Sequence, residues 1–183
     1  MKKALLIIII ILSIMFLAGC SSFDLSSWVC PDDQEFIELI NSLNTPEKIC
    51  KYMEDNFEWN ISIHTYSPYQ MYLANLEGWN DTGDCDDFAT FGTWVAHQHG
   101  YEVYRIMMWC KCNWFYGLPL ILPHVMGIYV EDGKYTYSND YIYKPLYADD
   151  FKSIVRDYEL TQYPVISYKV YDYENNIVEE GVE

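Results

Sequence analysis

The chain has 183 residues and a mass of 21.6 kDa, with 51% hydrophobic and 21% charged residues, a composition typical of one globular domain. Eleven Lys and Arg against 27 Asp and Glu give a net charge of -16. Such a chain repels phosphate backbones, which argues against nucleic-acid binding. Eighteen Tyr and six Trp favour a strand-rich, half-buried surface and exclude a polar, low-complexity linker.

The first twenty residues form a candidate export signal. Lys2 and Lys3 precede an apolar run over 4–18 that a single serine interrupts, and small residues then lead to Cys20. This order of basic, apolar and small-residue segments is typical of a cleaved signal peptide. The ending Leu17-Ala-Gly-Cys20 resembles the lipobox of prokaryotic lipoproteins, which implies cleavage before Cys20 and a diacylglycerol on its sulfur. A permanent transmembrane anchor is the alternative, but the run is shorter than the roughly 20 apolar residues that span a bilayer.

Three parts of the chain follow from this interpretation. Residues 1–19 are the signal peptide, residues 20–30 are a lipidated tether, and residues 31–183 are one folded domain. We expect the mature protein to lie outside the cytoplasm, at the cell envelope. Its acyl chains would hold it to the membrane without help from a basic patch.

Four cysteines remain once the lipidated cysteine and a candidate nucleophile, described below, are set aside: Cys30, Cys50, Cys110 and Cys112. An extracytoplasmic location permits disulfides, and Cys30–Cys50 with Cys110–Cys112 is the simplest pairing. A four-cysteine zinc site is the alternative, but the spacing lacks paired Cys-x-x-Cys knuckles. We therefore expect neither a metal nor a cofactor.

Helices are predicted early in the folded domain. Apolar residues in 35–43 recur at the spacing of an amphipathic helix. Thr45 then provides an N-cap, and Pro46 occupies the first turn of a second helix that ends near Phe57. A further short helix is expected over 69–76.

The most informative stretch runs from Gly83 to Gly100. It opens as Gly-Asp-Cys-Asp-Asp-Phe-Ala, and its apolar residues recur at helical spacing until Gly100 ends the helix. Cys85 is therefore expected at the N-terminus of a mostly buried helix, where unpaired N–H groups and the helix dipole favour a thiolate. The neighbouring aspartates oppose this, because nearby negative charge raises a thiol pKa. A catalytic Cys85 consequently requires a histidine partner, and a buried structural cysteine is the alternative.

Strands and turns are predicted after this helix. The expected elements are strands at 101–109, 124–130, 134–138 and 163–172, a loop holding Cys110, Cys112 and residues 117–119, a hairpin turn at Asp132-Gly133, a helix at 149–158, a turn at Asn175-Asn176, and a frayed acidic end at 179–183. The pattern predicts an α+β fold in which the helix of Cys85 packs on an antiparallel sheet.

The predicted hairpin places a histidine beside an amide and a carboxylate. His124 opens one strand, while Asn139 and Asp140 close the next. In an antiparallel hairpin the start of one strand lies beside the end of the other, so these side chains are expected to be close. If the sheet packs on the helix of Cys85, His124 can take the thiol proton and Asn139 or Asp140 can orient the imidazole.

At these residues the chain resembles a known family. The motif Gly83-Asp-Cys-Asp-Asp-Phe-Ala89, followed about 40 residues later by His124-Val-Met-Gly-Ile-Tyr-Val-Glu-Asp-Gly-Lys134, is similar to the core of the transglutaminase-like superfamily. The resemblance covers roughly residues 67–140. It implies a papain-like α+β fold, with the cysteine on a helix and the histidine and aspartate on successive strands.

The resemblance also implies roles for individual residues. Cys85 would be the nucleophile and His124 the base. The family's aspartate position falls on Asn139, with Asp140 directly after it, and the aromatic residue that usually follows the family's histidine is absent. An asparagine can orient a neutral imidazole but cannot stabilise an imidazolium by charge. The residue that completes the triad therefore stays open between Asn139 and Asp140.

Other assignments are less specific. An oxyanion hole would use the backbone N–H of Cys85 and an upstream donor, for which Gln70 and Trp79 are candidates. His97 and His99 are expected to face solvent rather than a metal. The segment from His124 to Tyr129 also resembles the His-Val-Gly-Ile-Tyr of NlpC/P60 cell-wall peptidases, although Met126 interrupts the match.

The sequence thus predicts a lipid-anchored enzyme that transfers acyl groups from amide bonds through a thiol. The expected substrate is a protein or a peptide, including the peptides of peptidoglycan, and the expected class is a cysteine peptidase or amidase. Crosslinking differs from hydrolysis only in whether an amine or water takes the acyl group. The alternative from a different class is a catalytically silent binding module that keeps the same fold.

Overall fold

The computed structural model of the chain describes residues 30–61, 65–78, 83–115 and 118–182. The expected signal peptide, Cys20, nearly all of the expected tether and Trp79 lie outside the described residues. Within the described ranges, no helix combines the length and apolar character needed to span a membrane.

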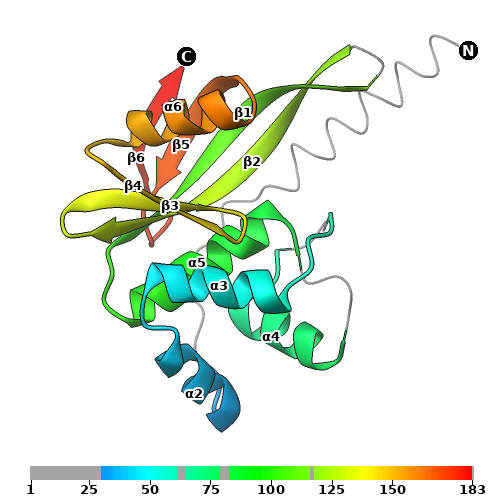
Figure 1. Cartoon of the computed structure of the whole chain (residues 1–183), viewed down its shortest axis with the longest axis vertical. Coiled ribbons are helices and arrows are strands. Elements are labelled where there is room, and N and C mark those ends of the chain that lie inside the picture. The colour runs from blue at the N-terminus through cyan, green and yellow to red at the C-terminus, as the bar shows by residue number, and fades with distance from the viewer. Residues whose placement is uncertain (1–29, 62–64, 79–82, 116–117, 183) are drawn as a thin grey trace, which may run out of the picture.

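Helices and antiparallel strands combine in an α+β arrangement, as the sequence predicts (Figure 1). The described helices are α2 (Gln34–Ser42), α3 (Pro46–Asn56), α4 (Pro68–Leu76), α5 (Cys85–Gln98) and α6 (Phe151–Thr161). The strands are β1 (Val103–Phe115), β2 (Leu118–Glu131), β3 (Lys134–Asn139), β4 (Ile142–Ala148), β5 (Val165–Tyr171) and β6 (Ile177–Val182).

Side-chain caps define where the early helices begin. The Asp33 carboxylate accepts hydrogen bonds from the backbone N–H groups of Glu35 and Phe36 at the start of α2. Thr45 caps α3, and Pro46 follows at the first helical position, where its missing N–H leaves no bond unmade. Both helix starts therefore agree with the sequence prediction.

The strands form a single antiparallel sheet in the order β4-β3-β2-β1-β5-β6. The turn between β2 and β3 is Asp132-Gly133, as predicted, and both residues have positive φ, 52° and 74°. β1 and β2 form a long hairpin that projects past the rest of the sheet (Figure 1).

The two faces of the sheet are covered by different helices. On one face, α2–α5 pack with Tyr129 and Val103 around a core rich in phenylalanine. On the other face, α6 packs against Met126 and Ile128 of β2 and against β1 and β5. Figure 1 shows the sheet between these two groups of helices. Alternate residues of β2 therefore belong to different cores.

The strands differ from the expectations in four ways. The predicted loop around Cys110 and Cys112 is part of β1, and Leu118–Glu131 is one strand in which His124 lies well inside β2 rather than at its start. The residues after Asp140 form a strand, β4, that the sequence pattern did not indicate. The acidic end forms β6, where Val170 pairs with Glu179 on the edge of the sheet. Charged residues are well tolerated on edge strands.

The expected disulfides and the zinc alternative are both contradicted. All five cysteines in the described residues are free thiols. Cys50 is a buried residue of α3, whereas Cys30 is exposed, so the two do not meet. Cys110 and Cys112 are buried in the core of α6, on the opposite face of the sheet from Cys50. These cysteines therefore cannot share one metal.

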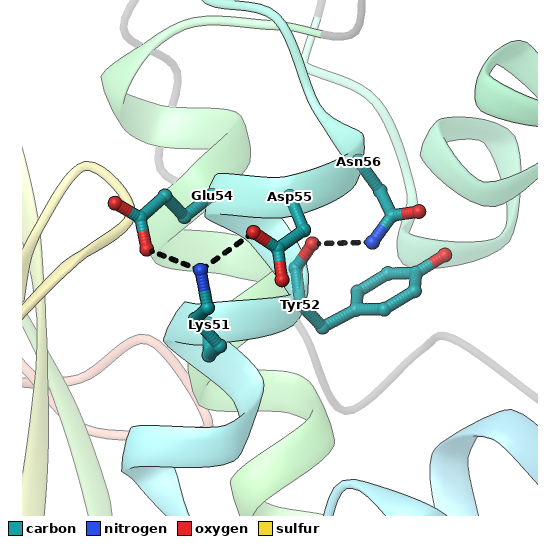
Figure 2. Close-up of polar contacts among 5 residues, drawn as sticks. All are labelled: Lys51, Tyr52, Glu54, Asp55 and Asn56. Atoms are coloured by element: carbon teal, nitrogen blue, oxygen red, sulfur yellow. Dashed lines mark hydrogen bonds and ion pairs between the residues drawn. The ribbon is translucent and has the colours of Figure 1, made fainter.

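The outward face of α3 is polar. Figure 2 shows the Lys51 ammonium between Glu54 at 3.1 Å and Asp55 at 2.6 Å, with the Asn56 amide donating to the Tyr52 carbonyl oxygen at 2.8 Å. The ion pairs are exposed and add little stability. The inward face, which carries Met53, supplies the packing.

The close approach of α5 to the sheet depends on Gly92. A Cβ at Gly92 would overlap the Tyr129 hydroxyl oxygen, which forms a 3.0 Å hydrogen bond with the Ser138 hydroxyl. Gly92→Ala should destabilise the protein by about 1–2 kcal/mol in urea unfolding, because overpacking outweighs the gain in helix propensity.

The matched test of this clash is a double-mutant cycle. In the Tyr129→Phe background the obstructing oxygen is gone, and Gly92→Ala should cost nothing or stabilise. Equal costs in both backgrounds would show that α5 does not approach the sheet at this point.

Candidate active site

Cys85 is the first residue of α5. Asp84 is the N-cap, and Asp84 and Asp87 form a capping box in which the Asp87 carboxylate accepts from the Asp84 N–H at 2.9 Å. Gly83 has a φ of +132°, and a Cβ there would lie 2.5 Å from the Asp87 side chain. The Gly-Asp-Cys-Asp-Asp motif is therefore the local structure that starts this helix, and it places Cys85 among the unpaired N–H groups of the first turn.

The aspartates of the motif tie neighbouring segments to the helix. The Asp87 carboxylate accepts from the Tyr66 N–H at 2.5 Å, and Asp86 accepts from the Thr65 hydroxyl at 2.7 Å. Together with Asp84 they form the one cluster of metal-type ligands found in the described part of the chain. These oxygens already accept capping and loop hydrogen bonds. The start of α5 therefore accounts for why the three carboxylates lie together.

His124 lies on the face of β2 that carries Met126 and Ile128, toward α6. Its Nε2 is 2.7 Å from the Asn139 Oδ1. The two residues are not direct partners across the strands. The β2–β3 ladder ends at the pair Gly127–Ser138, and beyond that pair the Asn139 side chain reaches His124 diagonally. The structure thus brings together the two residues that the sequence placed side by side, and Asn139 makes the hydrogen bond.

This hydrogen bond selects one form of the imidazole. The Asn139 oxygen is an acceptor, so Nε2 carries the hydrogen and donates it. In the neutral ring Nδ1 is then the lone-pair nitrogen, free to accept a proton. His124 is half-buried, and burial lowers its pKa, while the Asp140 charge and the Asn139 hydrogen bond act in the opposite direction.

Asp140 follows directly, with a φ of +51° at the turn into β4. Its Oδ1 is buried and has no hydrogen-bond partner among the described residues. Burial raises the pKa of this carboxyl, and the interaction with His124 opposes the rise. Asp140 therefore acts on the imidazole by charge, whereas Asn139 acts by hydrogen bonding.

Cys85 lies against the backbone of β2 at the residue after His124, whereas the His124 side chain lies on the α6 side of the strand. Beyond the end of β3, the backbone of Val125, the residue after His124, hydrogen-bonds the Cys85 sulfur. This bond favours the thiolate, but desolvation and the charges of Asp84 and Asp86 act against it and raise the pKa of Cys85 well above its usual value. The resting site therefore holds a neutral thiol, and the helix N-terminus alone does not produce a thiolate.

The other predicted site residues have different positions. Gln70 is exposed in the first turn of α4, where its side-chain oxygen accepts from the Ser67 N–H at 2.8 Å in a capping box. His99 does not face solvent as expected, because its Nε2 lies 2.8 Å from the Ile40 carbonyl oxygen. His97 is exposed and stacks on Tyr173.

One residue of the site was not predicted. Tyr158 of α6 stacks on His124, with ring centroids 5.2 Å apart. The sequence places Tyr158 only at the end of the expected helix over 149–158, and it carries no signal of which strand residue that helix covers. The contact between Tyr158 and His124 follows only from the packing of α6 on the sheet.

No family model and no curated protein matches the chain. The resemblance to the transglutaminase-like superfamily therefore rests on the two sequence motifs.

The raised pKa of Cys85 predicts the effect of removing a neighbouring charge. Asp86→Asn should lower the thiol pKa and speed alkylation of Cys85 severalfold at neutral pH, since about 1 kcal/mol of repulsion corresponds to a fivefold change. Asp55→Asn, on the exposed face of α3, is the control and should have no effect. Unchanged alkylation in Asp86→Asn would contradict the electrostatic account of this site.

Proposed function

We propose that this protein is a thiol-dependent acyl-transfer enzyme of transglutaminase-like type, acting on amide bonds through Cys85, His124 and Asn139. The observation that supports it best is the 2.7 Å contact between His124 Nε2 and Asn139 Oδ1. A half-buried cysteine at a helix N-terminus accompanies it, with its sulfur hydrogen-bonded to the backbone of Val125, the residue after His124. A nucleophile, a base and a residue that orients the base are the components an activated thiol needs.

The proposed reaction begins with a neutral pair. As the Cys85 sulfur attacks a carbonyl carbon, its proton passes to Nδ1 of His124, while Asn139 keeps the ring oriented. The negative oxygen of the tetrahedral intermediate is stabilised by N–H groups at the start of α5. His124 then gives the proton to the departing amine nitrogen as the C–N bond breaks, which leaves a thioester on Cys85.

The second half of the reaction releases the acyl group. His124 removes a proton from the incoming water or amine, which attacks the thioester carbonyl, and the proton returns to the Cys85 sulfur as the C–S bond breaks. Water gives hydrolysis, and a primary amine gives crosslinking. We favour hydrolysis of a peptide or amide bond as the primary reaction.

Asn139 and Asp140 divide the task that one aspartate would perform. Asn139 provides the hydrogen bond, and the buried charge of Asp140 supports the imidazolium that forms in the transition state. This arrangement compensates for the inability of asparagine to stabilise an imidazolium by charge.

The proposed location is the outer face of a membrane. It rests on the basic, apolar and Leu-Ala-Gly-Cys segments before the domain, with Cys20 as the lipidated residue. The substrate would then be a protein or a peptide of the cell envelope, including peptidoglycan peptides. The partial resemblance to NlpC/P60 peptidases points to the same class of substrate.

A catalytically silent binding module is the second candidate. The observation that favours it is the raised pKa of Cys85, which burial and then the charges of Asp84 and Asp86 produce and which keeps the thiol neutral. Both candidates share one fold and differ in whether an acyl-enzyme forms.

Trapping of the acyl-enzyme separates the two candidates. The full-length protein should form a thioester on Cys85 with amide or ester peptide substrates, detected by mass spectrometry after acid quenching. His124→Ala should slow its formation about 100-fold or more, the scale of general-base catalysis.

Conservative variants refine the same measurement. Asn139→Asp keeps the acceptor and should retain activity, whereas Asn139→Ala should lose much of it. Absence of any thioester across a broad peptide library, in a folded protein, would favour the binding module.

A further inference from the structure

Tyr158 lies against the flat face of the catalytic imidazole. The two ring planes are inclined by 23° and their centroids are 5.2 Å apart. Tyr158 is only 4% exposed, so its position is set by packing. Asn139 contacts the edge of the same imidazole at Nε2. The ring of His124 is therefore held from its edge by one residue and from its face by another.

Tyr158 is itself fixed from several directions. It belongs to the buried stripe of α6 with Phe151, Ile154 and Val155. The Cys110 thiol of β1 donates to the Tyr158 hydroxyl at 3.9 Å. A ring held by a helix and by a strand can transmit its orientation to a neighbour stacked on it.

The hydroxyl of Tyr158 is not suited to acid–base work. Burial raises the pKa of Tyr158 far above neutrality, and burial raises the pKa of Cys110 to about 11. Both groups stay uncharged at neutral pH. The part of Tyr158 that can influence His124 is therefore its aromatic face.

We propose that Tyr158 is a positioning residue for His124: its ring fixes the plane of the imidazole, and its electron-rich face favours the imidazolium formed during acyl transfer. This inference rests on the proposed function for its catalytic consequence. The stacking itself, and its effect on proton binding by His124, are independent of that function.

Opposing effects act on the charge of His124, so a stabilising contribution from the Tyr158 ring can change its pKa. Desolvation disfavours the imidazolium, the Asp140 carboxylate favours it, and Cys85 is neutral at rest. A cation over an aromatic face is stabilised to an extent that corresponds to about a two- to thirtyfold change in a binding constant. That range is enough to change the strength of the base.

The test changes the electronics of the ring without changing its shape. Tyr158→Phe removes the hydroxyl and keeps the face, and a ring-fluorinated phenylalanine at position 158 weakens the face. Tyr135 is the matched control, because it packs on Phe151 of the same core and receives the same two replacements. Imidazole titrations followed by NMR in the full-length protein report on His124, whose signal is assigned by its loss in His124→Gln.

Tyr158→Phe should leave the His124 proton-binding constant close to that of the parent. The fluorinated residue at 158 should lower that constant about three- to tenfold relative to Tyr158→Phe, and the same residue at 135 should not. The rate of Cys85 alkylation should fall in parallel. An unchanged His124 titration in the folded fluorinated protein would overturn the proposal.

The two proposals fail in different ways. If the titration responds but Cys85 forms no acyl-enzyme, the stacking role stands and the enzymatic function does not. If Cys85 reacts through His124 while fluorination changes nothing, the enzyme stands and the role of Tyr158 is refuted.

Discussion

The contact on which the site depends is the docking of the first turn of α5 against β2, at the point where β3 ends. The β2–β3 ladder stops at Gly127, and the backbone of Val125 turns to the Cys85 sulfur instead of to another strand. Pro123 lies two residues before Val125, so its backbone nitrogen faces the same side of β2, where no strand pairs. A proline nitrogen carries no hydrogen and needs no partner there. The end of one strand thus leaves the backbone of Val125, the residue after His124, available to the Cys85 sulfur.

Electrostatics at this point work against a preformed thiolate. Burial of the sulfur raises the pKa of Cys85, and the charges of Asp84, which caps α5, and of Asp86 raise it further. The same helix start therefore both positions the thiol and keeps it protonated. In the proposed reaction, activation falls to His124, which Asn139 orients by hydrogen bonding and Asp140 influences by charge. Chemistry in such a site depends on proton transfer within the reaction step.

Local signals in the sequence predicted the helix starts and the pairing of His124 with Asn139, because caps, helical periodicity and a two-residue hairpin turn act over a few residues. They misplaced the segment around Cys110, since glycine and proline near the hairpin tip resembled a loop while the long β1–β2 ladder made it a strand. The choice between Asn139 and Asp140, and the stacking of Tyr158, depend on side-chain directions and on the packing of α6. Those follow from tertiary structure and leave no local pattern.

The central claim is that His124 controls the reactivity of Cys85. Residue-resolved alkylation of the full-length protein across pH tests it directly, with the exposed Cys30 as an internal reference and the buried Cys50 as a measure of unfolding. The account predicts that His124→Ala slows alkylation of Cys85 strongly and leaves Cys30 unchanged. Equal alkylation of Cys85 with and without His124, in a protein whose Cys50 stays protected, would contradict it.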